Sequence, residues 1–243
     1  MKLAKAALAA VSLFPTFFSA PRGAQAQSKP EHRAFEFSVF GGGSFIGDGQ
    51  YATSVLGTTP AASRVVGLRY GGGYLFGASL TENRYRHVGA TLEYTFSNQP
   101  VRFTNLVNQP SSVGLSHSVH RFAYELLYYP LDRSARLRPY VFAGPGITLF
   151  RVAQDSILAG TAASRRLSDP WKFSMSWGGG AKYLIQDRWA VSVQFTDSVS
   201  GVPRYGLPGA AYYSGATLVP GFRPKGYLHQ KLISIGVIYQ WDR

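Results

Sequence analysis

Two short stretches combine residue types that hydrolytic enzymes use. The stretch LSHSVH (115–120) holds two serines and two histidines, and QFTDSVSG (194–201) holds an aspartate and two serines. A histidine can act as general base for a nearby hydroxyl when a third group orients its imidazole ring. The second stretch contains no histidine, so neither stretch completes such a set, and a hydrolase hypothesis rests on His117 or His120 alone.

Other kinds of catalytic and metal site find little support in the sequence. The chain has no cysteine, which excludes disulfides, thiolate catalysis and cysteine-based metal sites. No group of inward-facing His, Asp and Glu residues has the spacing of metal ligands. The glycine triplets at 41–43, 71–73 and 178–180 lack the G-x-x-x-x-G-K-[ST] pattern of a phosphate-binding loop. We therefore predict no metal, no cofactor and no enzymatic activity.

The elements that position these residues are strands. Eight segments alternate apolar and other residues with a period of two, and none shows a convincing helical period. They lie near residues 34–45, 65–80, 88–97, 117–130, 138–152, 171–185, 188–199 and 227–241. The sequence thus predicts an all-β protein.

The connections between these segments alternate in length. Residues 46–64, 98–116, 153–170 and 200–226 are long and rich in Gly, Pro and Ser, whereas 81–87, 131–137 and 186–187 are short. Regular alternation of this kind is expected of an up-and-down barrel whose two rims face different compartments. We predict an eight-stranded antiparallel barrel with both termini at the short-turn rim.

The direction in which the strand faces point is ambiguous from the period alone. In the third segment Val88, Leu92 and Phe96 share one face, and Thr91 and Glu93 share the other. A soluble lipocalin-like barrel would turn the apolar face inward, and a transmembrane barrel would turn it outward. Aromatic residues gather at the ends of the apolar faces, as in membrane girdles, and charges are nearly absent from them. We therefore predict a transmembrane β-barrel.

The first residues indicate export. A basic start, an apolar run and the A-x-A site at 24–26 have the form of a signal peptide, so we predict a signal peptide over residues 1–26 and a barrel domain over 27–243. Removing Lys2, Lys5 and Arg22 from 25 basic residues leaves 22 against 12 acidic ones. An exported basic chain suggests an anionic neighbour other than nucleic acid.

The last predicted strand carries a family resemblance. In SIGVIYQW (234–241), Ser234, Gly236, Tyr239 and Trp241 resemble the terminal-strand signal read by the outer-membrane barrel assembly machinery, although Asp242 and Arg243 follow the last aromatic residue. With the signal peptide and eight strands, the chain resembles small bacterial outer-membrane barrel proteins of the opacity and outer-membrane-protein-A membrane-domain type. The resemblance implies a monomer in the outer membrane, in contact with lipid and lipopolysaccharide.

If the apolar faces meet lipid, the alternate residues point into the lumen. Because an eight-stranded barrel is only wide enough for side chains to fill, charges there must be paired. We predict a lumenal network of three acids and three bases: Glu36, Glu93, Glu125, Arg69, Arg121 and Lys182.

The long loops carry an excess of bases that could contact the phosphates of lipopolysaccharide. The candidates are Arg165, Arg166, Arg204, Arg223 and Lys225. We expect a non-enzymatic barrel with a structural or adhesive role and a lumen plugged by charged side chains. The alternatives are a narrow pore for water, ions or small solutes, and a lipid A-modifying enzyme that uses His117 or His120.

Overall fold

The computed structural model describes residues 31–47, 49–55, 63–104, 112–152, 170–205, 212–214, 217–219 and 223–242. The predicted signal peptide, Arg165 and Arg166 lie outside these residues. Within the described part, no helix is long and apolar enough to span a membrane. The described strands are β1 (Phe35–Ile46), β2 (Gly49–Val55), β3 (Ser63–Tyr70), β4 (Gly73–Glu82), β5 (Val88–Thr104), β6 (Ser112–Tyr128), β7 (Leu137–Val152), β8 (Trp171–Gln186), β9 (Trp189–Gly201), β10 (Tyr212–Ser214), β11 (Thr217–Val219), β12 (Arg223–Pro224) and β13 (Tyr227–Trp241).

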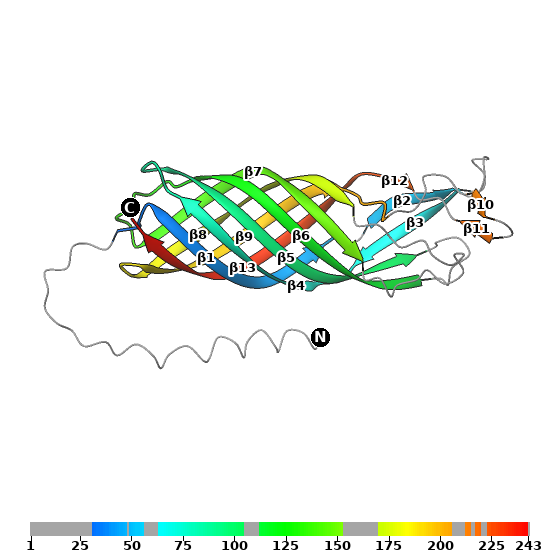
Figure 1. Ribbon diagram of the computed structural model, residues 1–243, viewed down its shortest axis with the longest axis horizontal. Coiled ribbons are helices and arrows are strands. Elements are labelled where there is room, and N and C mark those ends of the chain that lie inside the picture. Colours follow the sequence, from blue (N-terminus) through cyan, green and yellow to red (C-terminus); the bar gives the residue numbers. More distant parts are fainter. Residues whose placement is uncertain are drawn as a thin grey trace, which may run out of the picture.

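Eight of these strands close an antiparallel barrel, as predicted. Around the wall the order is β1, β4, β5, β6, β7, β8, β9 and β13, and the first and last strands pair to complete the circle. The C-terminus and the start of β1 lie at one end of the elongated barrel (Figure 1). At the other end lie β2, β3 and the short strands β10 to β12 (Figure 1).

The segment predicted as one strand over 65–80 is two strands. Gly71 and Gly72 separate β3 from β4, so the alternation of faces restarts between them. Strand β3 pairs with β2 and with the last four residues of β5, beyond the point where β4 stops. Strands β5 and β6 each extend over 17 residues, so this side of the wall is longer than the sequence indicated.

The two faces of the wall decide between the soluble and the membrane interpretations. Leu92 is 57% exposed on the outside, whereas its neighbour Glu93 is 4% exposed on the inside. The same arrangement holds around the wall: large apolar side chains are exposed, and serine, threonine, glutamine and charged side chains are buried. A soluble barrel has the opposite arrangement. The apolar exterior and polar lumen are those of a transmembrane β-barrel.

Glycine makes room for aromatic rings in this narrow lumen. A Cβ added to Gly178 would lie 2.0 Å from the carbonyl oxygen of Phe195 and 2.6 Å from Cζ of Phe142. Phe142 forms a buried cluster with Leu127, Tyr129 and Tyr140. The triplet at 178–180 lies within β8, as predicted, and leaves space for long lumenal side chains.

Candidate functional site in the lumen

The centre of the lumen holds an arginine between two glutamates. Arg121 of β6 pairs with Glu93 of β5 and donates at 3.2 Å to Glu125, four residues further along its own strand. All three side chains are almost fully buried. Arg121 and Glu125 are four positions apart, an even number, so they share one face of β6. Strand β5 pairs with β6 so that Glu93 lies opposite Ala123, which is midway between Arg121 and Glu125.

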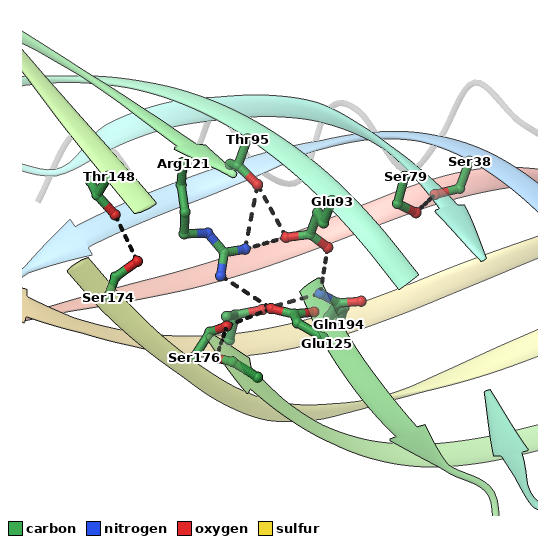
Figure 2. Close-up of polar contacts among 12 residues, drawn as sticks. Ser38, Ser79, Glu93, Thr95, Arg121, Glu125, Thr148, Ser174, Ser176 and Gln194 are labelled. Carbon is green, nitrogen blue, oxygen red and sulfur yellow. Dashed lines mark hydrogen bonds and ion pairs between the residues drawn. The ribbon is translucent and has the colours of Figure 1, made fainter. Parts of the chain in front are cut away.

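Neutral side chains complete this central cluster (Figure 2). Thr95 donates to one oxygen of Glu93 at 3.1 Å, and Gln194 donates to the other at 3.1 Å. Ser176 donates to Glu125 at 2.6 Å. These bonds come from strands β5, β8 and β9, so the cluster crosses the barrel from wall to wall. Hydrogen bonding of this kind makes buried charge tolerable.

A second cluster lies toward the end that holds the termini. Lys182 of β8 pairs with Glu36 of β1 and donates to the hydroxyl of Tyr129 at 2.8 Å. Asn83 and Gln240 donate to Glu36 at 2.9 and 3.0 Å. This terminal cluster therefore joins the beginning, middle and end of the chain.

Arg69, which we predicted to point into the lumen, is exposed on the outside. The prediction was wrong because it carried the alternation of β4 through the break at Gly71 and Gly72. Arg138 supplies the third lumenal base instead: it is fully buried, its guanidinium carbon lies 3.5 Å from the ring centre of Tyr129, and Nη2 donates to the carbonyl of Arg86. The period of β7 could have revealed it, because Arg138 shares a face with the buried Phe142.

A small cavity lies between the central and terminal clusters. Its volume is about 20 Å³, and its lining includes Glu36, Lys182, Glu93 and Glu125. One water molecule needs roughly 10–15 Å³ of such space. The cavity is therefore of the size of a single water.

Beyond the central cluster, the lumen passes through a polar layer to an aromatic one. Gln230 donates to Ser44 and Ser97 at 3.0 and 2.8 Å. Further on, His117 is fully buried and stacks on Phe150. Its Nε2 lies 3.2 Å from the hydroxyl of Tyr205. His117 comes four residues before Arg121 on β6, so both side chains point inward.

The second histidine of that stretch lies on the outside of the wall. His120 Nδ1 is 2.9 Å from the hydroxyl of Tyr94, beside Phe96. The two histidines of the stretch thus point to opposite sides of the wall. Among the described residues, no group of three or more His, Asp and Glu side chains could hold a metal ion.

The histidine missing from the stretch 194–201 is supplied by the neighbouring strand. Nδ1 of His229 in β13 lies 3.3 Å from Oδ2 of Asp197 in β9. Ser198 and Ser200 are buried on the lumenal side, however, whereas His229 is exposed on the outer side. A nucleophile and its base must be within hydrogen-bond reach, so these serines cannot use His229 as their base.

One histidine outside the strands closes the end of the terminal cluster. His32 is buried just before β1, and its Nδ1 lies 3.0 Å from Nε2 of Gln240. Burial lowers the pKa of His32 to about 4, against the attraction of Glu36, which raises it. The nearby Arg138 and Lys182 lower the pKa further. His32 is therefore neutral at pH 7.

The remaining predicted site residues lie in β13 and near the opposite rim. Ser234 is buried, Gly236 approaches Ser192, and the rings of Tyr239 and Trp241 stack on the outer face with centroids 6.1 Å apart. Arg204, Arg223 and Lys225 are exposed at the end opposite the termini. These three bases make no contact with the central or the terminal cluster among the interactions of the described residues. Their roles in assembly and in anion contact stay predictions.

A closed eight-stranded barrel with an apolar exterior and buried charged side chains in its lumen defines the class of small transmembrane β-barrels. No family model and no curated protein matches the sequence. Among solved structures, the outer membrane protein OprG from Pseudomonas aeruginosa matches with a TM-score of 0.58 and 16% identity, over 88% of this chain and 100% of that one. The chain thus has the fold of the small bacterial outer-membrane barrel proteins.

Two other solved structures have more distant similarity. Neisserial surface protein A matches with a TM-score of 0.44 and 14% identity, over 84% of this chain and 97% of that one. AlkL, an outer membrane protein determined in DMPC bilayers, matches with a TM-score of 0.45 and 14% identity, over 91% and 97%.

Proposed function

We propose that this protein is a monomeric, non-enzymatic barrel of the bacterial outer membrane whose lumen is closed to ions. Its role would be to stabilise the membrane and to present the rim opposite the termini to surface ligands. The outer-membrane location is supported by the fold and the apolar exterior, and by the resemblance of β13 to a barrel assembly signal. The observation that carries the closed lumen is the central cluster of Glu93, Arg121 and Glu125.

The central cluster supports closure for a physical reason. An ion that crossed the lumen would have to separate Arg121 from two carboxylates, and removing one partner from a buried ion pair costs about 3–5 kcal/mol. The cavity beside the cluster has room for about one water. A pore would need the whole hydrogen-bonded layer, including Thr95, Gln194 and Ser176, to move aside.

Contact with lipopolysaccharide is the second part of the proposal. Arg204, Arg223 and Lys225 are exposed, and they lie in or beside β12, which pairs with β2, and next to the paired ends of β9 and β13, at the rim opposite the termini. Guanidinium groups bind phosphate through paired charge-assisted hydrogen bonds. These residues would meet the phosphates of the outer leaflet if that rim faces the cell exterior.

Planar-bilayer conductance of the refolded barrel tests the closed lumen. We expect no discrete openings from the parent protein, and small openings from Arg121→Ala, which removes the bridge across the lumen. Arg84→Ala removes an arginine at the rim near the termini and should stay silent. A heat-modifiability gel shows that each variant has folded.

Discrete openings of the parent protein, altered by Glu93→Gln, would contradict the closed lumen and favour the narrow pore. A change in the mass of lipid A on expression would instead favour an enzyme. Solubility of the mature chain without detergent would exclude the membrane barrel altogether.

A further inference from the structure

Two arginines face each other on the outer wall, near the rim opposite the termini. Arg69 of β3 lies directly opposite Arg102 of β5, and both are exposed. The next pair in the ladder, Tyr70 and Val101, is buried. Since successive residues of a strand point to opposite faces, this alternation fixes both arginines on the outward face.

Like charges directly opposite each other in a sheet are destabilising, because the Cβ atoms of such a pair are only about 4.5–5.5 Å apart. Within the described part of the chain, neither guanidinium has an acidic partner. Among the described residues, no acid competes with another molecule for the donors of these two guanidinium groups. On the side of β5 away from β3, the residue opposite Arg102 is Gly114 of β6, which has no side chain that could cover the guanidinium.

The position of the pair on the wall indicates what it meets. Leu92, Phe96 and Arg102 share the outer face of β5, with Asn98 and Pro100 between the last two. Arg102 comes six positions after Phe96, which is about 20 Å along the strand and about 15 Å along the barrel axis for a strand tilted by about 40°. The face thus changes from apolar to polar to cationic as it leaves the hydrocarbon layer.

We propose that Arg69 and Arg102 form a clamp for a phosphate group of the lipopolysaccharide that surrounds the barrel. The pair projects sideways from the wall, so its neighbours are molecules of the same leaflet. Two guanidinium forks on one phosphate neutralise their mutual repulsion and supply parallel charge-assisted hydrogen bonds. This inference rests on the proposed outer-membrane location, and it assigns an anion site on the wall rather than in the loops.

Binding of fluorescent lipopolysaccharide to the full mature barrel in zwitterionic vesicles tests the clamp. The parent should bind phosphorylated lipopolysaccharide at least about tenfold more tightly than the dephosphorylated form. Arg69→Gln and Arg102→Gln should each remove most of this preference, and the double variant should lose little more, because the two side chains act on one group. The matched control is Arg84→Gln with Arg136→Gln, which removes the same charge from the exposed surface at the other rim.

Stability without lipopolysaccharide gives a second readout that a structural role would not produce. In vesicles that lack it, each single variant should resist urea at least as well as the parent, since the substitution relieves repulsion. Added lipopolysaccharide should stabilise the parent more than the variants.

Three outcomes separate the possible failures. If the double variant keeps the preference for phosphorylated lipopolysaccharide, the clamp is wrong while the membrane barrel stands. If the single variants unfold more easily without lipopolysaccharide, the arginines support the fold and the clamp is likewise wrong. If the parent itself does not insert into vesicles, the proposed location fails, and the clamp fails with it.

Discussion

The two charged clusters of the lumen have opposite imbalances. The central cluster sets two carboxylates, Glu93 and Glu125, against the single base Arg121. The terminal cluster sets the single carboxylate Glu36 beside two bases, Lys182 and Arg138; Lys182 pairs with Glu36, and Arg138 lies against Tyr129. Three acids and three bases balance over the described part of the lumen, but neither cluster balances alone.

The difference shows that the buried charges lie in two layers along the barrel, one rich in acids and one rich in bases. The cavity between the clusters is lined by Glu36 and Lys182 of the terminal cluster and by Glu93 and Glu125 of the central cluster, so the acid-rich and base-rich clusters border the same cavity. Electrostatic interactions are stronger in such a low-dielectric interior than in water. The substitution that matters most in each layer should be the one that removes its minority charge.

Arg121→Met should have the largest effect, because it leaves Glu93 and Glu125 facing each other with no cation between them. We expect the free energy of unfolding to fall by about 3–5 kcal/mol. Urea titration of the refolded barrel in phospholipid vesicles measures it. The triple variant that adds Glu93→Gln and Glu125→Gln should recover part of the loss. A loss of less than about 1 kcal/mol from Arg121→Met alone would show that the clusters are not held by charge.

Glu36→Gln and Glu125→Gln compare the layers directly. Among the described residues, Glu36 is the acid that pairs with Lys182, so its neutralisation leaves Lys182 without its counter-charge and should cost about 3 kcal/mol. Glu125→Gln removes the excess acid of the central cluster and keeps an oxygen for Ser176, so it should cost less than about 1 kcal/mol. The same urea titration ranks the two variants. Equal losses of unfolding free energy in the two variants would show that the two clusters do not differ in their charge balance.

His32 should give the terminal cluster a pH dependence. The pKa of its imidazole is about 4 in the folded barrel, against 6.5 for the ordinary group, so below pH 6.5 the unfolded chain takes up a proton that the folded chain does not. The free energy of unfolding should therefore fall by about 2 kcal/mol between pH 7 and pH 5, and the loss should level off below pH 4. His32→Gln should remove this slope, measured by urea titration at several pH values. An unchanged slope in the variant would assign it to other groups.

Gly178→Ala tests the space that the lumen leaves for Phe142. The added methyl group would collide with the backbone of Phe195 and the ring of Phe142, and overpacking of this kind costs about 1–3 kcal/mol. Gly41→Ala is the matched control, since its methyl group would meet only the carbonyl oxygen of Leu75, at an ordinary 3.6 Å. Thermal unfolding of both variants in detergent should separate them. Equal unfolding midpoints of the two variants would mean that the backbone and the ring of Phe142 shift to make room for the methyl group at no cost.

The period of two was enough to predict the fold and most of the lumen. Five of the six predicted lumenal charges are buried where their strands alternate without interruption. Arg69 failed because two glycines broke the alternation, and a glycine pair looks the same in sequence whether it bends a strand or ends it. Arg138 and His117 were within reach of the same rule, because each shares a face with lumenal residues of its own strand. The pairing of His229 with Asp197 could not be read from either strand, because it depends on the register between them.

The network also has a consequence for how the chain folds. Glu36 is hydrogen-bonded to Gln240, 204 residues away, and the first strand closes on the last. Contacts of such long sequence separation form slowly, because the entropy cost of closing a large loop comes before the contact can stabilise the chain. The carboxylate of Glu36 therefore gains its full set of partners only when β13 arrives. Ring closure therefore completes the hydrogen bonds of Glu36, and an intermediate that lacks the last strand would carry an open seam and a carboxylate without its bond from Gln240.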